Sequence, residues 1–334
     1  MSGGEDQLRR MQTAPPILPI GRYRLHFEGL GKRGPSGFLG SAWRGAMGHA
    51  LRKAVCVTRM TQCQPCLLYR SCPYPYIFET PPPANTAKMR KYTAAPHPFL
   101  LDLPFPDTEP SDGDQTLGLT LIGRGNAELP YMIHAFQKAG EEGLGRSRVP
   151  RILRSVSQEV PPGSATWTVI YDGLGLRAFP AEAPPIPEMP QIIEVCFESP
   201  LRLQRDEHLV GVRDFRFSDL FGALLRRISM LSYFHTDVPL ETNFLELSRL
   251  GSAVEWEESQ LEWRDWTRFS SRQKRELQMG GLIGRVSLRL EAGSPFWPYL
   301  WLGQWIHAGK GASMGLGRYS IQIPSLPKTD GRNS

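Results

Sequence analysis

Apolar and polar side chains alternate along several short segments of the first half of the chain, as they do in strands with one buried face. Residues 17–30 alternate in this way around Tyr23. Residues 41–55 instead repeat apolar side chains every three or four positions, which predicts an amphipathic helix with Ser41 as its N-cap. The same two periods predict further strands at 116–123, 151–160 and 166–171 and a second helix at 129–138.

The order of elements begins again after a proline-rich segment. Five prolines fall between residues 180 and 190, a composition typical of a semi-stiff connector. Beyond it the pattern predicts strands at 192–197, 252–262, 282–290 and 317–323 and helices at 217–234 and 298–306. We therefore expect an α+β protein with two tandem ferredoxin-like (RRM-like) domains.

These patterns predict that the chain has five parts. We expect a disordered tail over 1–16, an N-terminal domain over 17–180 with a cysteine-rich insertion at 56–72, a linker at 181–190, a C-terminal domain with a glycine-rich loop over 191–324, and a tail over 325–334. A chain of 334 residues is long enough for two separate cores. It has no apolar run of membrane-spanning length and no signal-peptide core, so we expect a cytoplasmic protein.

Positive charge is concentrated in one part of the chain. Lys plus Arg exceed Asp plus Glu by 39 to 33, which gives a net charge of +6. The segment 268–318 holds eight basic and two acidic residues, so its own net charge is also +6. Tryptophan and phenylalanine residues are interleaved with these charges, and the combination fits a nucleic-acid surface. A solvated basic face over an aromatic core would give the same pattern.

A glycine-rich segment lies near the end of this basic region. Glycine permits positive φ and close backbone approach, so such a loop can present N–H groups to phosphate. The segment lacks the Lys-Ser/Thr ending of a Walker loop and leads into a strand pattern, which favours a polyanion wider than a nucleotide. Its candidate residues are His307, Gly309, Lys310, Gly311, Gly315, Gly317 and Arg318.

Four of the five cysteines lie within seventeen residues, at Cys56, Cys63, Cys66 and Cys72. Clustered cysteines in a cytosolic chain favour a metal site over disulfides, and four thiolates suit structural zinc. An iron–sulfur cluster and a plain thiol-rich loop remain as alternatives, although the C-x6-C-x2-C-x5-C spacing lacks the repeat of bacterial ferredoxins.

Histidines supply the candidate proton-transfer groups. His49 and Lys53 are four residues apart on the polar side of the first predicted helix, so they share one face. Imidazole is suited to accept a proton near neutral pH, and a neighbouring cation can stabilise negative charge. His49 could equally be a solvated surface histidine, and His26 either a groove contact or a partnered buried side chain. No carboxylate pair with metal-binding spacing accompanies them, so we expect no catalytic metal. If the substrate is RNA, its own 2′-hydroxyl can serve as the nucleophile.

Three runs of residues in the C-terminal third are distinctive: Trp263 to Gln273, Gly280 to Gly284 and His307 to Tyr319. They resemble the CRISPR precursor-RNA processing endoribonucleases of the RAMP superfamily. Near the N-terminus, Trp43 to Arg52 and Cys63 to Phe78 resemble the cysteine-containing branch of that family.

The resemblance implies two ferredoxin-like domains that bind CRISPR repeat RNA and cleave it without metal, leaving a 5′-hydroxyl and a 2′,3′-cyclic phosphate. It implies a catalytic histidine near the first helix, which His49 matches best, with Lys53 as charge stabiliser, Tyr23 as a helper and His307 as a rival. It also implies that RNA is held by the four loop glycines and by Arg44, Arg52, Arg268, Arg272, Lys274, Arg275, Lys310 and Arg318.

The partners implied are repeat RNA, mature guide RNA and other subunits of a CRISPR effector complex, with no membrane. Two other functions remain open. The chain could be a non-cleaving RNA-binding subunit of such a complex, or a general zinc-stabilised nucleic-acid module.

Overall fold

The computed structural model of the chain describes residues 15–30, 37–82, 95–104, 114–145, 148–270 and 275–324. Most of the two predicted tails, residues 1–14 and 325–334, lies outside these ranges. Within them, no helix is both long enough and apolar enough to cross a membrane.

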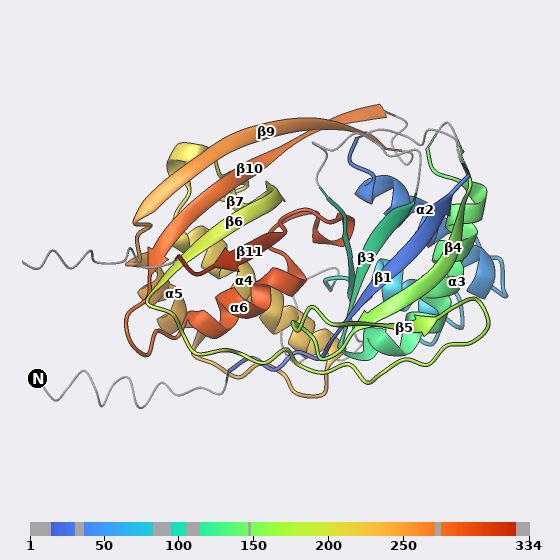
Figure 1. The fold of residues 1–334 in the computed structure, drawn as a ribbon, viewed down its shortest axis with the longest axis horizontal. Helices are drawn as coiled ribbons and strands as arrows, with labels where there is room; N and C mark the ends of the chain where they lie inside the picture. The colour runs from blue at the N-terminus through green and yellow to red at the C-terminus, as the bar shows by residue number, and fades with distance from the viewer. Residues whose placement is uncertain are drawn as a thin grey trace, which may run out of the picture.

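The first domain is an antiparallel sheet with two helices packed on one face (Figure 1). Its strands lie in the order β2-β3-β1-β4-β5, which is the ferredoxin-like order with β5 added beside β4. The elements are β1 (Ile20–Gly29), α2 (Gly40–Val55), the π-helical turn η1 (Pro75–Glu79), β2 (Phe99–Asp102), β3 (Gln115–Ile122), the 3-10 turn η2 (Gly123–Glu128), α3 (Leu129–Glu142), β4 (Arg151–Glu159) and β5 (Trp167–Tyr171).

The second domain repeats this topology. Its four-stranded antiparallel sheet has the order β11-β6-β10-β9, and a short β7–β8 hairpin stands apart from it. The elements are β6 (Ile192–Leu201), β7 (Gln204–Arg205), β8 (His208–Leu209), η3 (Val212–Asp214), α4 (Phe217–His235), α5 (Phe244–Ser252), β9 (Glu258–Ser270), β10 (Arg275–Arg289), α6 (Trp297–Ile306), η4 (Ala312–Met314) and β11 (Tyr319–Gln322). Two tandem ferredoxin-like domains were predicted from the sequence, and this prediction is confirmed.

The alternation of β1 separates two environments. Tyr23, Leu25 and Phe27 are buried beneath the helices, while the even-numbered residues between them lie on the opposite, open face of the sheet. Helix α2 adds Trp43 to the same core, where its ring lies 4.7 Å from that of Phe27. The helix begins at Gly40 with Leu39 as the N-cap residue, so the predicted cap at Ser41 is wrong.

The second domain differs from the sequence prediction in two places. Residues 252–262 were predicted as one strand, but the chain forms helix α5 as far as Ser252 and β9 begins only at Glu258. The β9–β10 hairpin is also longer than predicted, and Figure 1 shows it arching toward the first domain. The ring of Trp266 on β9 meets Phe38 there at 5.2 Å, edge to face.

Aromatic residues of the basic segment mostly build the second core. Phe296, Trp297 and Trp305 are buried among the side chains of α4 and α6. At these three positions the aromatic residues therefore belong to the buried face of a packed helix. The alternative of a base-stacking surface is wrong for them.

The proline-rich connector is held against the second domain. The indole N–H of Trp297 donates to the carbonyl oxygen of Pro187 at 2.9 Å, and that of Trp301 donates to Pro185 at 2.8 Å. Proline leaves its own carbonyl free to accept such bonds, and its fixed φ keeps the segment extended. The path between the two domains is thus fixed along α6.

Candidate functional site: the junction between the two domains

The glycine-rich loop of the second domain packs directly on the first helix of the first domain. A Cβ added at Gly40, the first residue of α2, would clash with the carbonyl oxygen of Met314 in η4. One turn further along, Arg44 donates from Nε to the hydroxyl of Ser313 at 3.1 Å. The two segments singled out from the sequence are therefore neighbours, although about 270 residues separate them.

Arg318 ties the two domains together at this junction. Its guanidinium forms ion pairs with Asp102 at the end of β2 and, at 2.6 Å, with Glu198 on β6. The Arg318 side chain is 26% exposed. Both carboxylates accept from it, so in this arrangement the predicted RNA-binding arginine is committed to protein contacts.

Arg44 and Arg52, also predicted to bind RNA, have protein partners as well. Arg44 approaches Nε2 of His97 at 3.0 Å and lies over the ring of Phe78 at 4.3 Å. Arg52 donates to the carbonyl oxygens of Met60 and Thr61 at 2.6 and 2.7 Å, which anchors the cysteine-rich insertion to α2. Neither guanidinium is an uncommitted phosphate ligand.

The four loop glycines serve close packing within the protein. All four have positive φ, where a side chain would be strained. Gly309 approaches the carbonyl oxygen of Arg202, and Gly317 approaches that of Ala308 so closely that a Cβ would clash. The N–H groups of Gly315 and Gly317 already donate to protein carbonyls, at 2.9 and 3.1 Å. A Cβ at Gly311 would meet the side chain of Leu316, and one at Gly315 would meet Leu101 and Phe38.

Lys310 is the group that this loop presents to solvent. Its side chain is exposed at the turn, and its backbone N–H donates to Arg202 at 2.9 Å, which holds the turn in place. A lysine on a backbone fixed in this way is a suitable phosphate contact.

Of the predicted catalytic residues, only His49 and Lys53 reach the surface. His49 is exposed on the outer side of α2, and Lys53 one turn later pairs with Glu142 of α3 at 3.4 Å. Tyr23 is buried, with its hydroxyl donating to Oδ1 of Asn126 at 3.0 Å, and burial raises the pKa of that hydroxyl well above 10. It is therefore poorly placed as a catalytic helper.

His307 is buried beside the glycine loop. Its side chain is 2% exposed, its φ is 56°, and its Nδ1 has no partner within the described part of the chain. Burial lowers its pKa to about 4, so the ring is neutral and shielded from solvent at pH 7. The buried position favours His49 over His307 for contact with RNA, and the choice between them stays a prediction.

Two further histidines line the inner side of the junction, of which His235 is buried and His97 partly buried. His97 bonds through Nδ1 to the hydroxyl of Thr80 at 2.8 Å, and burial lowers its pKa to about 3. His235, at the end of α4, lies 2.7 Å from the carbonyl oxygen of Pro96, and burial lowers its pKa to about 4. Both rings stay neutral and connect residues 95–97 to their neighbours.

The open face of the first sheet carries a basic and aromatic group of which the sequence analysis identified only His26. Arg24 lies over the ring of Trp167, with 3.8 Å from its guanidinium carbon to the ring centroid. Two positions along β1, His26 bridges the hydroxyls of Thr116 and Ser157, at 3.2 Å each. Burial, with Arg24 nearby, lowers the pKa of His26.

This open-face group could have been found from the alternation itself. Arg22, Arg24 and His26 are the polar partners of the buried positions of β1, but only strand pairing brings Trp167 beside them. An aromatic ring with a cation and neutral donors on an open sheet suits single-stranded RNA, because bases stack and phosphates need charge.

The β9–β10 hairpin holds the remaining predicted RNA contacts. The backbone of Arg268 and Arg275 lies toward the distal end of the two strands, where Arg275 pairs with Ser270 and Leu277 pairs with Arg268. Arg272 and Lys274 fall outside the described residues.

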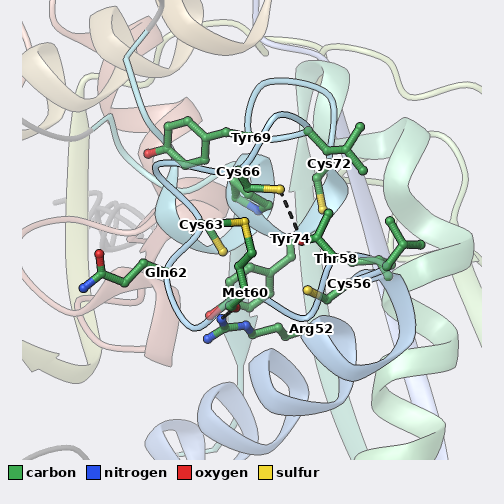
Figure 2. Close-up of a pocket in the computed structure, with 14 residues that line it drawn as sticks. Arg52, Cys56, Thr58, Met60, Gln62, Cys63, Cys66, Tyr69, Cys72 and Tyr74 are labelled. Atoms are coloured by element: carbon green, nitrogen blue, oxygen red, sulfur yellow. Dashed lines mark hydrogen bonds between the residues drawn. The ribbon is translucent and has the colours of Figure 1, made fainter.

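The four predicted metal ligands gather around one pocket. Cys56, at the end of α2, lines it together with Cys63, Cys66 and Cys72 of the insertion (Figure 2). All four are free thiols. Within the described ranges, no three Cys, His, Asp or Glu side chains are already arranged to hold a metal ion.

Comparisons with known families match the two domains separately. A model described as an N-terminal domain matches residues 18–182. A model described as CRISPR-associated endoribonuclease Cas6 matches residues 195–319, which include the β9–β10 hairpin and the glycine-rich loop. Among proteins with curated descriptions, none matches the chain.

Several solved structures share the whole architecture. A Cas6 protein of Thermus thermophilus matches with a TM-score of 0.52 and 15% identity, covering 91% of this chain and 99% of the other. The product complex of the same Cas6 protein matches with a TM-score of 0.57 at 16% identity, covering 91% of this chain and 100% of the other. The product complex of a second Cas6 protein matches with a TM-score of 0.51 at 18% identity, covering 92% of this chain and 100% of the other.

A larger assembly also contains this fold. The partial Cas6-RT-Cas1–Cas2 complex matches with a TM-score of 0.50 at 12% identity, covering 92% of this chain and 46% of that one. At such identities these structures establish a shared fold. They do not separate a cysteine-containing branch, which stays a prediction.

Proposed function

We propose that this chain is a CRISPR-associated endoribonuclease of the Cas6 family, and that it binds CRISPR repeat RNA and cleaves precursor transcripts into mature guide RNAs in the cytoplasm. Cleavage proceeds without a metal ion. The 2′-oxygen of the repeat attacks the adjacent phosphorus, the bond from phosphorus to the 5′-oxygen breaks, and the products are a 2′,3′-cyclic phosphate and a 5′-hydroxyl.

The proposal is carried by the contact between the glycine-rich loop and the start of α2. Because η4 lies against Gly40 and Arg44, the second domain's loop and the helix that bears His49 form one continuous junction. RNA bound to both domains would cross this junction, so a strand held by Lys310 could pass along α2.

His49 is the proposed general base. An exposed imidazole can take the 2′-hydroxyl proton, which is the step that a neutral histidine accelerates at neutral pH. Lys53 stabilises the developing negative charge on phosphate when it exchanges its contact with Glu142 for the RNA. Both groups lie on a helix held by a packed core, which fixes their positions relative to the junction.

The RNA-binding surface that we propose combines the two domains. Arg24 and Trp167 supply a cation and a stacking ring on the open sheet of the first domain. Lys310 and the basic end of the β9–β10 hairpin supply charge from the second. The same contacts would retain the mature guide after cleavage.

The test is cleavage of the cognate repeat by the pure protein in EDTA. We expect two products, with a phosphatase-resistant cyclic phosphate on the upstream fragment and a kinase-labelled 5′-hydroxyl on the downstream one. A substrate with a 2′-deoxy nucleotide at the scissile position should bind but stay intact. Cleavage of that deoxy substrate, or a strict requirement for magnesium, would contradict the mechanism.

One observation favours a second candidate, a non-cleaving RNA-binding subunit of a CRISPR effector complex. Among the described residues His49 has no hydrogen-bond partner to orient its ring, and the other predicted helpers, Tyr23 and His307, are buried. In the same EDTA assay this candidate predicts a shifted but intact repeat. The Cas6-RT-Cas1–Cas2 complex shows that this fold occurs within larger CRISPR assemblies.

A further inference from the structure

The cysteine-rich insertion places four thiols around a single pocket between the end of α2 and a series of turns. Figure 2 shows Cys56, Cys63, Cys66 and Cys72 surrounding the same space, with Thr58 and Met60 among them. Cys56 is the C-cap residue of α2 and the other three cysteines come from the turns, so the pocket joins regular to irregular structure.

The turn between the two central cysteines brings their backbones together. The N–H of Cys66 donates to the carbonyl oxygen of Cys63 at 2.9 Å, and the N–H of Tyr69 donates to Cys66 at 2.9 Å. The hydroxyl of Thr58 lies 3.3 Å from Sγ of Cys66. Both cysteines of this C-x2-C pair line the same pocket, and this spacing is typical of structural zinc sites.

The insertion has no hydrophobic core that would hold it in shape. No residue from 57 to 74 is buried, and Leu67 is 87% exposed. The described structure gives this stretch no helix or strand before the π-helical turn at Pro75. Its main apolar contact is made by Tyr74, which is half-buried and stacks on Phe78. With so little buried apolar surface, the stretch must offset its loss of conformational entropy by other means, and small modules without a core commonly do so with a bound metal.

We propose that Cys56, Cys63, Cys66 and Cys72 bind one structural zinc ion. Each thiol would lose its proton on binding, and four thiolates complete a closed tetrahedral site with no position for substrate. The sulfur atoms must draw together to reach that geometry, since no three potential ligands are yet arranged to hold an ion within the residues described. The turns of the insertion can make this adjustment because no buried side chain fixes them.

The site would also stabilise the end of α2. Arg52 donates to two carbonyl oxygens of the insertion, and its guanidinium lies 5.6 Å from the ring centroid of Tyr74. Zinc would thereby hold the insertion against the helix that carries His49. Zinc binding does not depend on the proposed cleavage of RNA, so either proposal can fail without the other.

The experiment is metal analysis of the full chain purified without chelator. We expect one zinc per chain in the parent protein and in Cys196→Ser, and loss of the bound zinc in Cys63→Ser with Cys66→Ser. Cys196 lies on β6, away from the insertion, and is the matched control. The absence of stoichiometric metal, or of any difference between these variants, would overturn the proposal.

A second measurement does not depend on the folding of cysteine variants. The parent protein, stripped and reloaded with cobalt, should show the intense sulfur-to-cobalt charge-transfer bands and the visible bands of a tetrahedral four-thiolate site. Zinc should then displace these bands at one equivalent. A brown protein containing iron and labile sulfide would refute zinc in favour of an iron–sulfur cluster, and cobalt spectra without thiolate bands would refute the ligand set.

Discussion

Replacing Arg318 with methionine tests whether this residue binds the domains together or contacts RNA. The substitution keeps most of the side chain's volume but leaves Asp102 and Glu198 without their shared cation. Exposed ion pairs contribute about 0–1 kcal/mol, whereas removing one partner of a fully buried pair costs about 3–5 kcal/mol. The three side chains are 26%, 26% and 36% exposed, an intermediate case. We expect the free energy of unfolding to fall by about 2–3 kcal/mol.

The assay is urea denaturation monitored by circular dichroism. The dependence of the unfolding free energy on urea concentration, the slope m, should be the same in each variant, which checks that the unfolding reaction itself is unchanged. Arg285→Met is the matched control, because Arg285 also pairs with a carboxylate of β6, Glu194, but is 54% exposed. We expect that variant to lose no more than about 1 kcal/mol. Equal losses from the two variants, together with weaker repeat binding by Arg318→Met alone, would show that the Arg318 guanidinium serves RNA and refute the structural role.

Three further predictions concern the site. His49→Ala should slow repeat cleavage by about 10²- to 10⁴-fold with unchanged affinity, measured by single-turnover kinetics and gel shift, whereas His134→Ala, on the exposed side of α3, should match the parent. Arg24→Ala should weaken repeat binding and reduce the salt slope of log K by about one, while the exposed Arg154→Ala should do so less. Stability should fall as pH drops from 7 to 5, because the buried histidines stay neutral when folded but protonate near pH 6.5 when unfolded. The loss is about 2 kcal/mol for each of the three lowered pKa values, measured by urea denaturation, and His235→Gln should reduce it.

Each of these predictions has its own contrary result. Equal cleavage by His49→Ala and the parent would remove His49 from the mechanism. Unchanged RNA affinity in Arg24→Ala would remove the open sheet face from the binding surface. A stability that is flat between pH 7 and pH 5 would contradict the lowered pKa values of the three histidines.

The sequence alone determined the architecture of the two domains. Alternation in β1 and the helical period in α2 record which side of each element is buried, and that information is local. Repetition of the same order of elements after the proline-rich connector then predicts a second ferredoxin-like domain, which the strand order confirms. Helix α5 was missed because it is short: the pattern predicted no element over residues 244–251, and the strand expected at 252–262 overlaps the helix only at Ser252.

Only the tertiary structure decided what the candidate site residues contact. From the sequence, Arg318 was predicted to be available to RNA. In the structure it pairs with Asp102, which lies 216 residues away along the chain. The sequence predicts His307 to be a loop histidine, but the packing of the second domain buries it. Trp167 comes beside Arg24 only through the pairing of strands. Local periodicity shows only that a side chain lies on the polar face of its own helix or strand. Whether another element then covers or pairs it depends on contacts that are distant in sequence, so only the folded chain could show it.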